Sequence, residues 1–158
     1  MAMKVALIYY SRSGTTEEMA HVIARELKAK GVEVDMHAVE KFNSKSLTEY
    51  DGIIIGSPTY YGTCAAEVKK LFDESVVLHG KLDGKAGAAF ASSANIGGGN
   101  ETTVLSILEA MLIHGMIIQG DPQGDHYGPV AVSTLDARSE GNCKRLAERF
   151  VALLKKVR

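Results

Sequence analysis

The feature that most constrains this sequence is a regular alternation of short apolar runs with amphipathic helical segments. Residues 4–10 (KVALIYY) are apolar, β-branched or aromatic, which is typical of a buried strand. Residues 15–30 then place Met19, Val22 and Ile23 on one side of a predicted helix. The same pairing of a buried strand with an amphipathic helix returns along the rest of the chain.

The full pattern predicts a five-stranded parallel sheet. The predicted strands are residues 4–10, 32–39, 51–58, 85–93 and 116–120, and the predicted helices are residues 15–30, 65–78, 104–114 and 136–157. Residues 41–50 are predicted to be a polar connection with one helical turn, and residues 121–134 a loop that returns as a short extension of the fifth strand. Fully apolar strands that alternate with helices indicate an α/β fold with helices on both faces of the sheet. No linker or repeat divides the sequence, so we expect residues 1–158 to form a single domain.

Composition excludes several classes of protein. A chain with 46% hydrophobic and 23% charged residues and a net charge of −1 is typical of a soluble domain, and it offers no basic surface for nucleic acid or an acidic membrane. Cys64 and Cys143 are far apart and lie in no metal-ligand spacing, so neither a disulfide nor a metal site is predicted. Without a recognisable signal peptide or transmembrane run, a cytoplasmic location is expected.

The segment SRSGTT follows the first predicted strand and is rich in hydrogen-bond donors. It carries hydroxyls at Ser11, Ser13, Thr15 and Thr16, and Gly14 lets the backbone approach a ligand closely. Free amides and the dipole at a helix start favour an anion. The lysine of a Walker loop is absent, which favours a monophosphate. An ordinary N-cap is the alternative, but it would need only one hydroxyl.

Two further loops at the same predicted edge have unusual compositions. Residues 56–63 (GSPTYYGT) place Tyr60 and Tyr61 side by side, and such rings suit stacking on a flat heterocycle. Residues 92–103 (SSANIGGGNETT) contain three consecutive glycines, which suit a loop whose amides lie close to a flat ligand. The alternatives are a plain turn for the first loop and a flexible surface lid for part of the second.

These motifs resemble those of the flavodoxin-like NAD(P)H:quinone oxidoreductases, the family first named as tryptophan-repressor-binding proteins. SRSGTT, GSPTYYG and ASSANIGGGNETT followed by LIHGMII carry the likeness, which covers almost the whole chain. The resemblance implies a flavodoxin-like three-layer α/β/α sandwich with strand order 2-1-3-4-5. It also implies FMN at the point where the strand order reverses, for which flavodoxin is itself the standard example.

The resemblance further implies which residues hold FMN. The ribityl phosphate would be held by Ser11, Arg12, Ser13, Gly14, Thr15 and Thr16. The isoalloxazine ring would be flanked by Pro58, Thr59, Tyr60, Tyr61 and Gly62, and its other edge would be lined by Ser92, Ser93, Ala94, Asn95, Gly97, Gly98 and Gly99. His126 would lie near the flavin and orient the acceptor or donate a proton, with an ordinary surface histidine as the alternative.

The expected activity is reduction of FMN by NAD(P)H followed by two-electron reduction of a quinone or a similar small acceptor. A flavodoxin-type electron carrier without turnover and a non-redox flavin-binding module are the alternatives. Carriers are commonly strongly acidic, and the net charge of −1 argues against that reading. Residues 40–50 are too short for the insertion that helps such reductases form a tetramer. The sequence leaves a homo-oligomer, either a dimer or a tetramer, as an alternative to a monomer.

Overall fold

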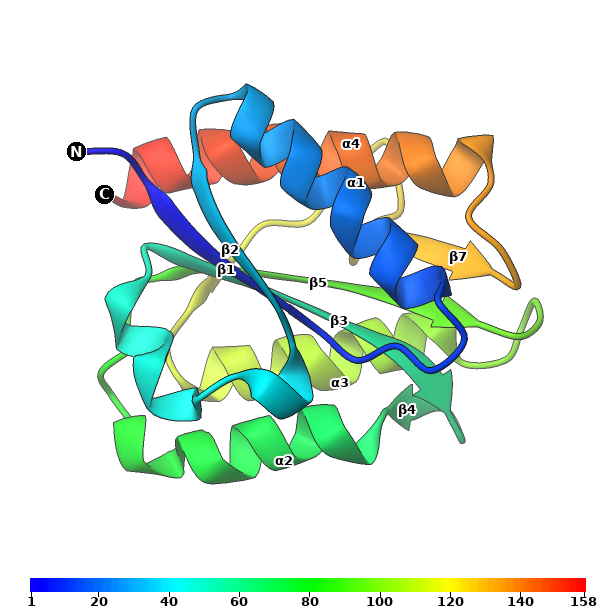
Figure 1. The fold of residues 1–158 in the computed structure, drawn as a ribbon, viewed down its shortest axis with the longest axis horizontal. Helices are drawn as coiled ribbons and strands as arrows, with labels where there is room; N and C mark the ends of the chain where they lie inside the picture. Colours follow the sequence, from blue (N-terminus) through cyan, green and yellow to red (C-terminus); the bar gives the residue numbers. More distant parts are fainter.

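The computed structural model describes residues 1–158 as a parallel sheet between two layers of helices (Figure 1). The strands are β1 (Lys4–Tyr9), β2 (Glu33–Ala38), β3 (Gly52–Tyr60), β4 (Thr63–Cys64), β5 (Ala86–Ser93), β6 (Ile117–Ile118) and β7 (Val130–Val132). The α-helices are α1 (Thr15–Ala29), α2 (Ala66–Glu74), α3 (Asn100–Ile113) and α4 (Ala137–Val157). Short 3-10 helices are η1 (Val39–Lys41), η2 (Ser44–Glu49) and η3 (Ser75–Leu78).

The sheet confirms the predicted strand order, although it contains seven strands. Its main path runs β2-β1-β3-β5-β6, and every pair along it is parallel. β6 pairs with the start of β5, and β7 pairs in parallel with the end of β5. The two short strands therefore share one position in the sheet, which residues 119–129 interrupt. Counting them as one and setting aside the antiparallel β4 gives the expected order 2-1-3-4-5.

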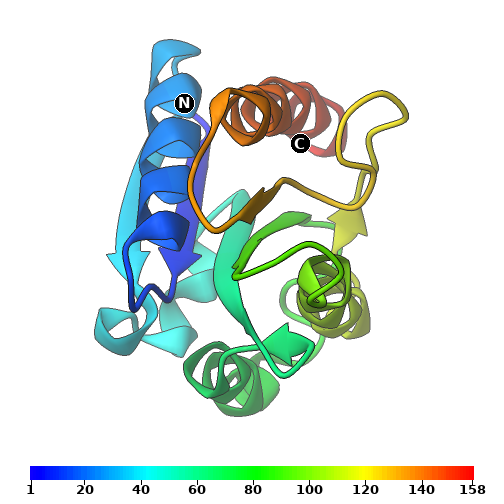
Figure 2. The same ribbon diagram turned by 90° about the vertical axis from the view of Figure 1, so that its right-hand side faces the viewer.

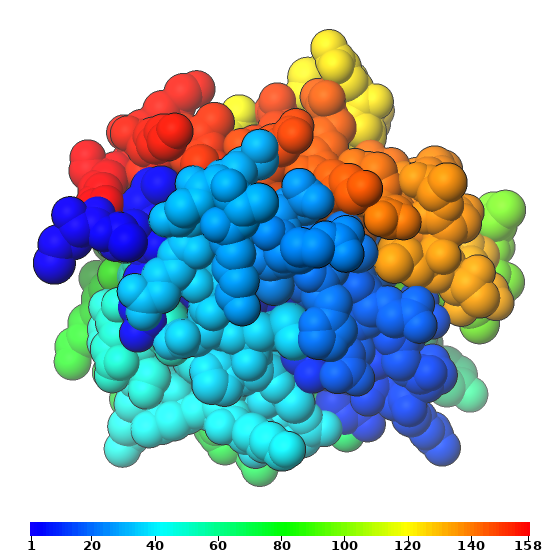
Figure 3. All heavy atoms as spheres, turned by 45° about the horizontal axis from the view of Figure 1, so that its top comes forward, coloured from blue at the N-terminus to red at the C-terminus, as the bar shows by residue number.

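Alternation along the strands divides the core between the two faces of the sheet. Val5 and Leu7 of β1 pack with α1 and α4, whereas Ala6 and Ile8 pack with α2 and α3. Successive side chains of a strand point to opposite faces, so a fully apolar strand needs helices on both sides. Figure 3 shows α1 and α4 lying side by side over one face, with the two chain ends close together.

The predicted fifth strand is shorter than expected, Ile117–Ile118 rather than residues 116–120, and three other predicted boundaries were also wrong. α3 begins at Asn100 rather than at residue 104, because Gly99 adopts a left-handed conformation and accepts the first helical hydrogen bond from Thr103. β3 continues through Pro58 to Tyr60 and turns back as β4, so the tyrosine segment is a hairpin rather than an open loop. The helix predicted over residues 65–78 tightens into the 3-10 helix η3 after Glu74.

Two further observations concern the apolar character of the helices and the state of the two cysteines. None of the helices combines the length and the apolar character that crossing a membrane requires. Both cysteines are buried and have free thiols, and burial raises the pKa of Cys143 to about 12.

Candidate functional site

Four connecting segments meet at the edge of the sheet where the parallel strands end (Figure 2). We name them the first loop (residues 10–14), the tyrosine hairpin (residues 59–64), the glycine loop (residues 94–99) and the fourth loop (residues 133–136). The hydroxyls of Thr16 and Ser92, 2.9 Å apart and both buried, join α1 to the end of β5. The Thr15 hydroxyl donates to the Ser133 carbonyl at 3.1 Å. The structure thus gathers the three predicted cofactor-binding segments at one edge.

The start of α1 presents backbone donors without acceptors. Gly14, the N-cap residue, has φ of 108°, and no side chain caps the helix. The N–H groups of Thr15, Thr16 and Glu17 therefore make no hydrogen bond within the chain. A Cβ built on Gly14 would meet no atom within 4 Å, so open space lies in front of the loop. Together with the helix dipole, these amides form a site suited to an anion.

The hydroxyls of this segment play different parts. Those of Thr15 and Thr16 are engaged within the protein, and Ser11 Oγ accepts the Gly14 N–H at 3.1 Å. Ser13 and Arg12 are exposed, and Arg12 forms no ion pair. The anion donors of the site are therefore mainly backbone amides, and several hydroxyls shape the loop that presents them.

The tyrosine hairpin carries its two rings differently. The Tyr60 ring packs edge-on against Tyr10, with ring centroids 6.3 Å apart. Tyr61 and Gly62 form the two-residue turn, and both have positive φ, of 49° and 80°. Such turns favour Asn or Gly, so Tyr61 occupies a strained position while its side chain is fully exposed. Tyr61 is thus the ring that is free to cover a ligand.

The glycine loop combines open amides with close backbone contact. Gly97 and Gly99 have φ of 70° and 98°, and their N–H groups make no hydrogen bond within the chain. The Gly98 N–H donates to the Asn95 carbonyl. A Cβ on Gly99 would lie 2.7 Å from the Gly62 Cα, so the loop and the hairpin touch through their backbones. The remaining predicted residues of these two segments lie as follows: Ser93 is buried and donates to the Asn95 carbonyl, Ala94 is exposed, Pro58 lies in β3, and Thr59 bonds to Thr103.

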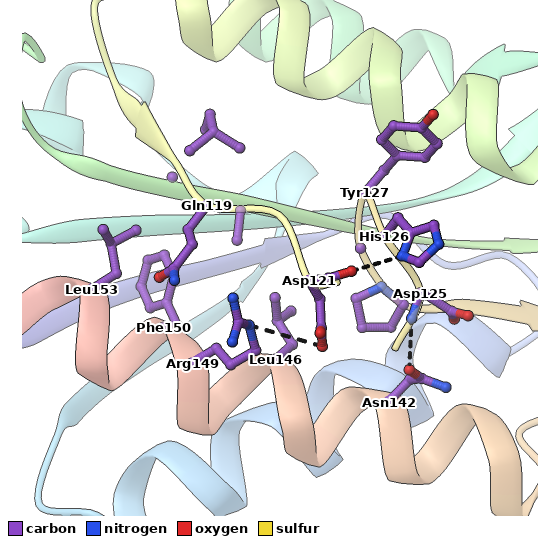
Figure 4. A pocket seen from close by; sticks show the side chains of 15 residues that line it. Gln119, Asp121, Asp125, His126, Tyr127, Asn142, Leu146, Arg149, Phe150 and Leu153 are labelled. Atoms are coloured by element: carbon purple, nitrogen blue, oxygen red, sulfur yellow. Dashed lines mark hydrogen bonds and ion pairs between the residues drawn. The ribbon is translucent and has the colours of Figure 1, made fainter. Parts of the chain in front are cut away.

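His126 is not brought together with the other predicted site residues. It lies within residues 119–129 and lines a pocket formed with β5 and α4, which includes no residue of the first loop, the tyrosine hairpin or the glycine loop (Figure 4). Its Nδ1 is 2.7 Å from the Asp121 carbonyl, which can only accept, so Nδ1 carries the proton and Nε2 is left unpaired. Its neighbour Asp125 does border a hollow beside Gly97 and Gly99. No hydrogen bond joins His126 to the first loop, the tyrosine hairpin or the glycine loop.

Residues 119–129 are held on α4 by arginines that the sequence analysis did not single out. Arg145 binds both carboxylate oxygens of Asp121, and Arg149 donates to the Gly120 carbonyl at 2.7 Å. Hydrogen bonding from the Arg145 guanidinium holds the pKa of Asp121 well below its usual range. Arg138 donates to Asp125 at 2.7 Å. In the sequence, the signal that could have indicated these contacts was the spacing of basic residues along the predicted last helix.

Two other residues at the edge were also missed. Ser133 has φ of 66°, rare for a residue with a side chain, and its carbonyl holds the Thr15 hydroxyl. The Thr102 hydroxyl lies 2.5 Å from the Gly62 carbonyl. No local pattern in the sequence indicates either contact.

Comparisons with known proteins agree with this fold. The profile of the Flavodoxin domain family matches residues 6–102. A flavodoxin of Clostridium saccharobutylicum is 33% identical, over 98% of this chain and 99% of that protein. An NAD(P)H dehydrogenase (quinone) of Sinorhizobium fredii is 36% identical, over 75% of this chain and 71% of that protein. The solved structure of the flavodoxin, WrbA-like protein from Agrobacterium tumefaciens has the same fold, with a TM-score of 0.85 at 22% identity, over 99% of this chain and 100% of that one.

Proposed function

Because the chain belongs to the flavodoxin family, we propose that it binds FMN at the carboxyl edge of the sheet and catalyses NAD(P)H-dependent two-electron reduction of quinones. The observation that carries the cofactor assignment is the uncapped start of α1. Three backbone N–H groups point out of a helix whose N-cap Gly14 faces open space. A phosphate accepts several hydrogen bonds at once, so it satisfies these donors as a neutral ligand would not.

The other two segments suit the flat ring of the same cofactor. The exposed Tyr61 ring offers a face for stacking, and the unpaired amides of Gly97 and Gly99 offer donors to a polar ring edge. The Thr16–Ser92 contact joins the start of α1 to the strand that leads into the glycine loop, and the close approach of Gly99 to Gly62 joins that loop to the hairpin. The donor set therefore fits a phosphate and a heterocycle joined by a short chain.

The chain's own residues bind and orient in this proposal. When bound, FMN supplies the transfer of two electrons from NAD(P)H to the acceptor. The amides of Thr15, Thr16 and Glu17 hold the phosphate, and the glycine loop and Tyr61 hold the ring. His126 acts on the acceptor rather than on FMN, because the pocket that it lines includes no residue of the three segments that hold FMN. In its doubly protonated form the imidazole can donate the Nε2 proton to a quinone oxygen as that oxygen gains charge, because the Nδ1 proton stays hydrogen-bonded to the Asp121 carbonyl.

A flavodoxin-type electron carrier is the second candidate, and the extent of the sequence match favours it. The chain covers 99% of the Clostridium flavodoxin but 71% of the Sinorhizobium dehydrogenase. Net charge favours the enzyme instead, because a charge of −1 gives little steering toward a basic protein partner. Several relatives near 35% identity carry the dehydrogenase name, which also supports the enzyme.

One experiment separates the candidates. The purified protein is titrated with FMN while flavin fluorescence is followed, and oxidation of NADH and NADPH is then measured with benzoquinone as acceptor. Saturable quenching followed by quinone-dependent oxidation is the expected result. Tight FMN binding with no turnover would select the carrier. A protein that takes up no FMN at any concentration would remove the cofactor assignment itself.

A further inference from the structure

One face of α3 joins the helix to the tyrosine hairpin through hydroxyl groups. We call Thr102, Thr103 and Ser106 the hydroxyl row. Thr102 Oγ1 lies 2.5 Å from the Gly62 carbonyl, Thr103 Oγ1 lies 2.9 Å from Thr59 Oγ1, and Ser106 Oγ accepts the Cys64 N–H at 3.3 Å. Thr103 is fully buried, whereas Thr102 is exposed at the end of the row next to the glycine loop. Thr102 is therefore the member whose bond adds least to the core.

The single proton of the Thr102 hydroxyl can be assigned to one acceptor. Thr102 Oγ1 lies near two carbonyls, those of Gly62 at 2.5 Å and Gly99 at 2.9 Å. The Gly99 carbonyl already accepts the Thr103 N–H and lies 2.9 Å from the Thr103 hydroxyl. The Gly62 carbonyl is an outward group of the turn, and no other donor reaches it. A carbonyl oxygen has two lone pairs, and two donor groups of Thr103 already lie at the Gly99 carbonyl. We therefore assign the Thr102 proton to the hydrogen bond with the Gly62 carbonyl.

The turn that Thr102 holds is weak by itself. β4 contains only Thr63 and Cys64, and the turn places Tyr61 in a left-handed conformation that tyrosine disfavours. Short hairpins are marginal without packing, so this one depends on its contacts with α3 and with Gly99. Thr102 spans that contact, because it bonds to Gly62 and belongs to the helix that Gly99 caps.

We propose that Thr102 is a positioning residue that closes the tyrosine hairpin on the glycine loop before any ligand binds. The inference rests on the proposed function, because the closed pair of segments is the ring site for FMN. A site ordered in advance binds more tightly, since binding then need not pay for ordering the loop. Without the hydroxyl, the hairpin would open more often in the free protein, and FMN would bind more weakly.

The test compares Thr102→Val, which removes the hydroxyl at nearly constant size, with Thr102→Ser, which keeps it. Thr48→Val is the matched control, because the Thr48 hydroxyl makes only a long contact of 3.5 Å with the Lys45 carbonyl, within η2. Hydrogen exchange of residues 60–64 and 97–101 is measured in the free protein, and FMN affinity is measured by fluorescence quenching. We expect Thr102→Val to speed hydrogen exchange in these two segments. We also expect it to raise the FMN Kd roughly fivefold, which corresponds to the net free-energy contribution of one hydrogen bond.

Two controls complete the expectation. Thr102→Ser and Thr48→Val should both match the parent protein in exchange and in FMN Kd. The melting temperature of Thr102→Val should stay close to that of the parent, because Thr102 is exposed. If that variant fails to fold, Thr102→Ala repeats the measurement without the valine methyl groups.

The possible failures can be told apart. Parent-like exchange in residues 60–64 of Thr102→Val would overturn the proposal, whatever FMN does. Faster exchange with an unchanged FMN Kd would also overturn it, because the closed hairpin would then not be the ring site. If the parent binds no FMN, the proposed function fails, and the exchange data alone decide whether Thr102 closes the hairpin.

Discussion

The hydroxyls of Thr16 and Ser92 lie 2.9 Å apart in the buried interior, although 76 residues separate them in the chain. The pair joins the first turn of α1 to the end of β5. Through it, the segment that presents the phosphate donors is held against the strand that leads into the glycine loop. This contact is the structural basis for treating the two segments as one site.

Loss of one member of this pair should destabilise the protein, because the other hydroxyl is left buried and unpaired. We expect Thr16→Val to lower the free energy of unfolding of the FMN-free protein by about 1–3 kcal/mol. The double variant Thr16→Val/Ser92→Ala should recover part of that loss. Urea unfolding of the parent, both single variants and the double variant gives the coupling energy. Additive losses would show that the two hydroxyls do not interact.

Gly14→Ala should weaken FMN binding more than riboflavin binding. An alanine at φ of 108° is strained, so relief of the strain would move the amides at the start of α1. Only FMN carries the phosphate that those amides would hold. Fluorescence titrations should show an FMN Kd raised about tenfold or more, since strain of this kind costs roughly 1–2 kcal/mol. Equal losses for both flavins would contradict a phosphate site at Gly14.

Asp121→Asn should loosen residues 119–129 and make the free energy of unfolding less dependent on pH in the acidic range. The pKa of Asp121 is lowered in the folded state, so the unfolded chain takes up its proton first as the pH falls. The stabilisation is therefore fully present above the ordinary pKa of 3.8 and is lost progressively below it. At pH 7 we expect the variant to lose about 2 kcal/mol, the scale of a charged hydrogen bond. Urea unfolding from pH 7 to pH 3 should show the two proteins converging.

Gly56→Ala and Gly141→Ala should change stability in opposite directions. A Cβ on Gly56 would lie 2.1 Å from the buried Phe90 ring, so we expect a loss of about 1–3 kcal/mol, which Phe90→Leu should partly relieve. Gly141 lies inside α4, and a Cβ there would meet no atom within 4 Å. Gly141→Ala should gain roughly 0.5–1 kcal/mol, because alanine favours the helix. Thermal unfolding measures both, and equal effects would show that the Phe90 contact is not tight.

His126→Gln should leave the FMN Kd unchanged and slow quinone reduction. The hydrogen bond of the side chain is to the Asp121 carbonyl, and its pocket includes none of the flavin-binding segments, so those segments should be unaffected. Glutamine cannot donate a proton as imidazolium does, so kcat with benzoquinone should fall by about 10²-fold. Tyr127→Phe, in the same exposed segment, serves as the control. An unaltered kcat in the glutamine variant would show that His126 is an ordinary surface residue.

The elements that sequence patterns predicted well are those whose signal is local and repeated. β1 and α1 lie within one residue of their predicted ends, because an apolar run and a helical face are each encoded within a few residues. The start of α3 was misplaced, since three consecutive glycines conceal which one caps the helix. The β3–β4 hairpin was missed because Tyr61 is an unusual residue for its turn.

The sequence by itself determined the α/β fold class and the three unusual connecting segments, whereas the strand order and the flavin came from the resemblance to flavodoxin-like proteins. Periodicity and turn composition act over short stretches, and a single chain displays them in full. Only the tertiary structure decided which groups remain free to bind. The pairing of Thr16 with Ser92, the closure of Thr102 on Gly62 and the grip of Arg145 on Asp121 each join distant segments. Such contacts depend on how the crossovers place helices against strands, which no local pattern encodes.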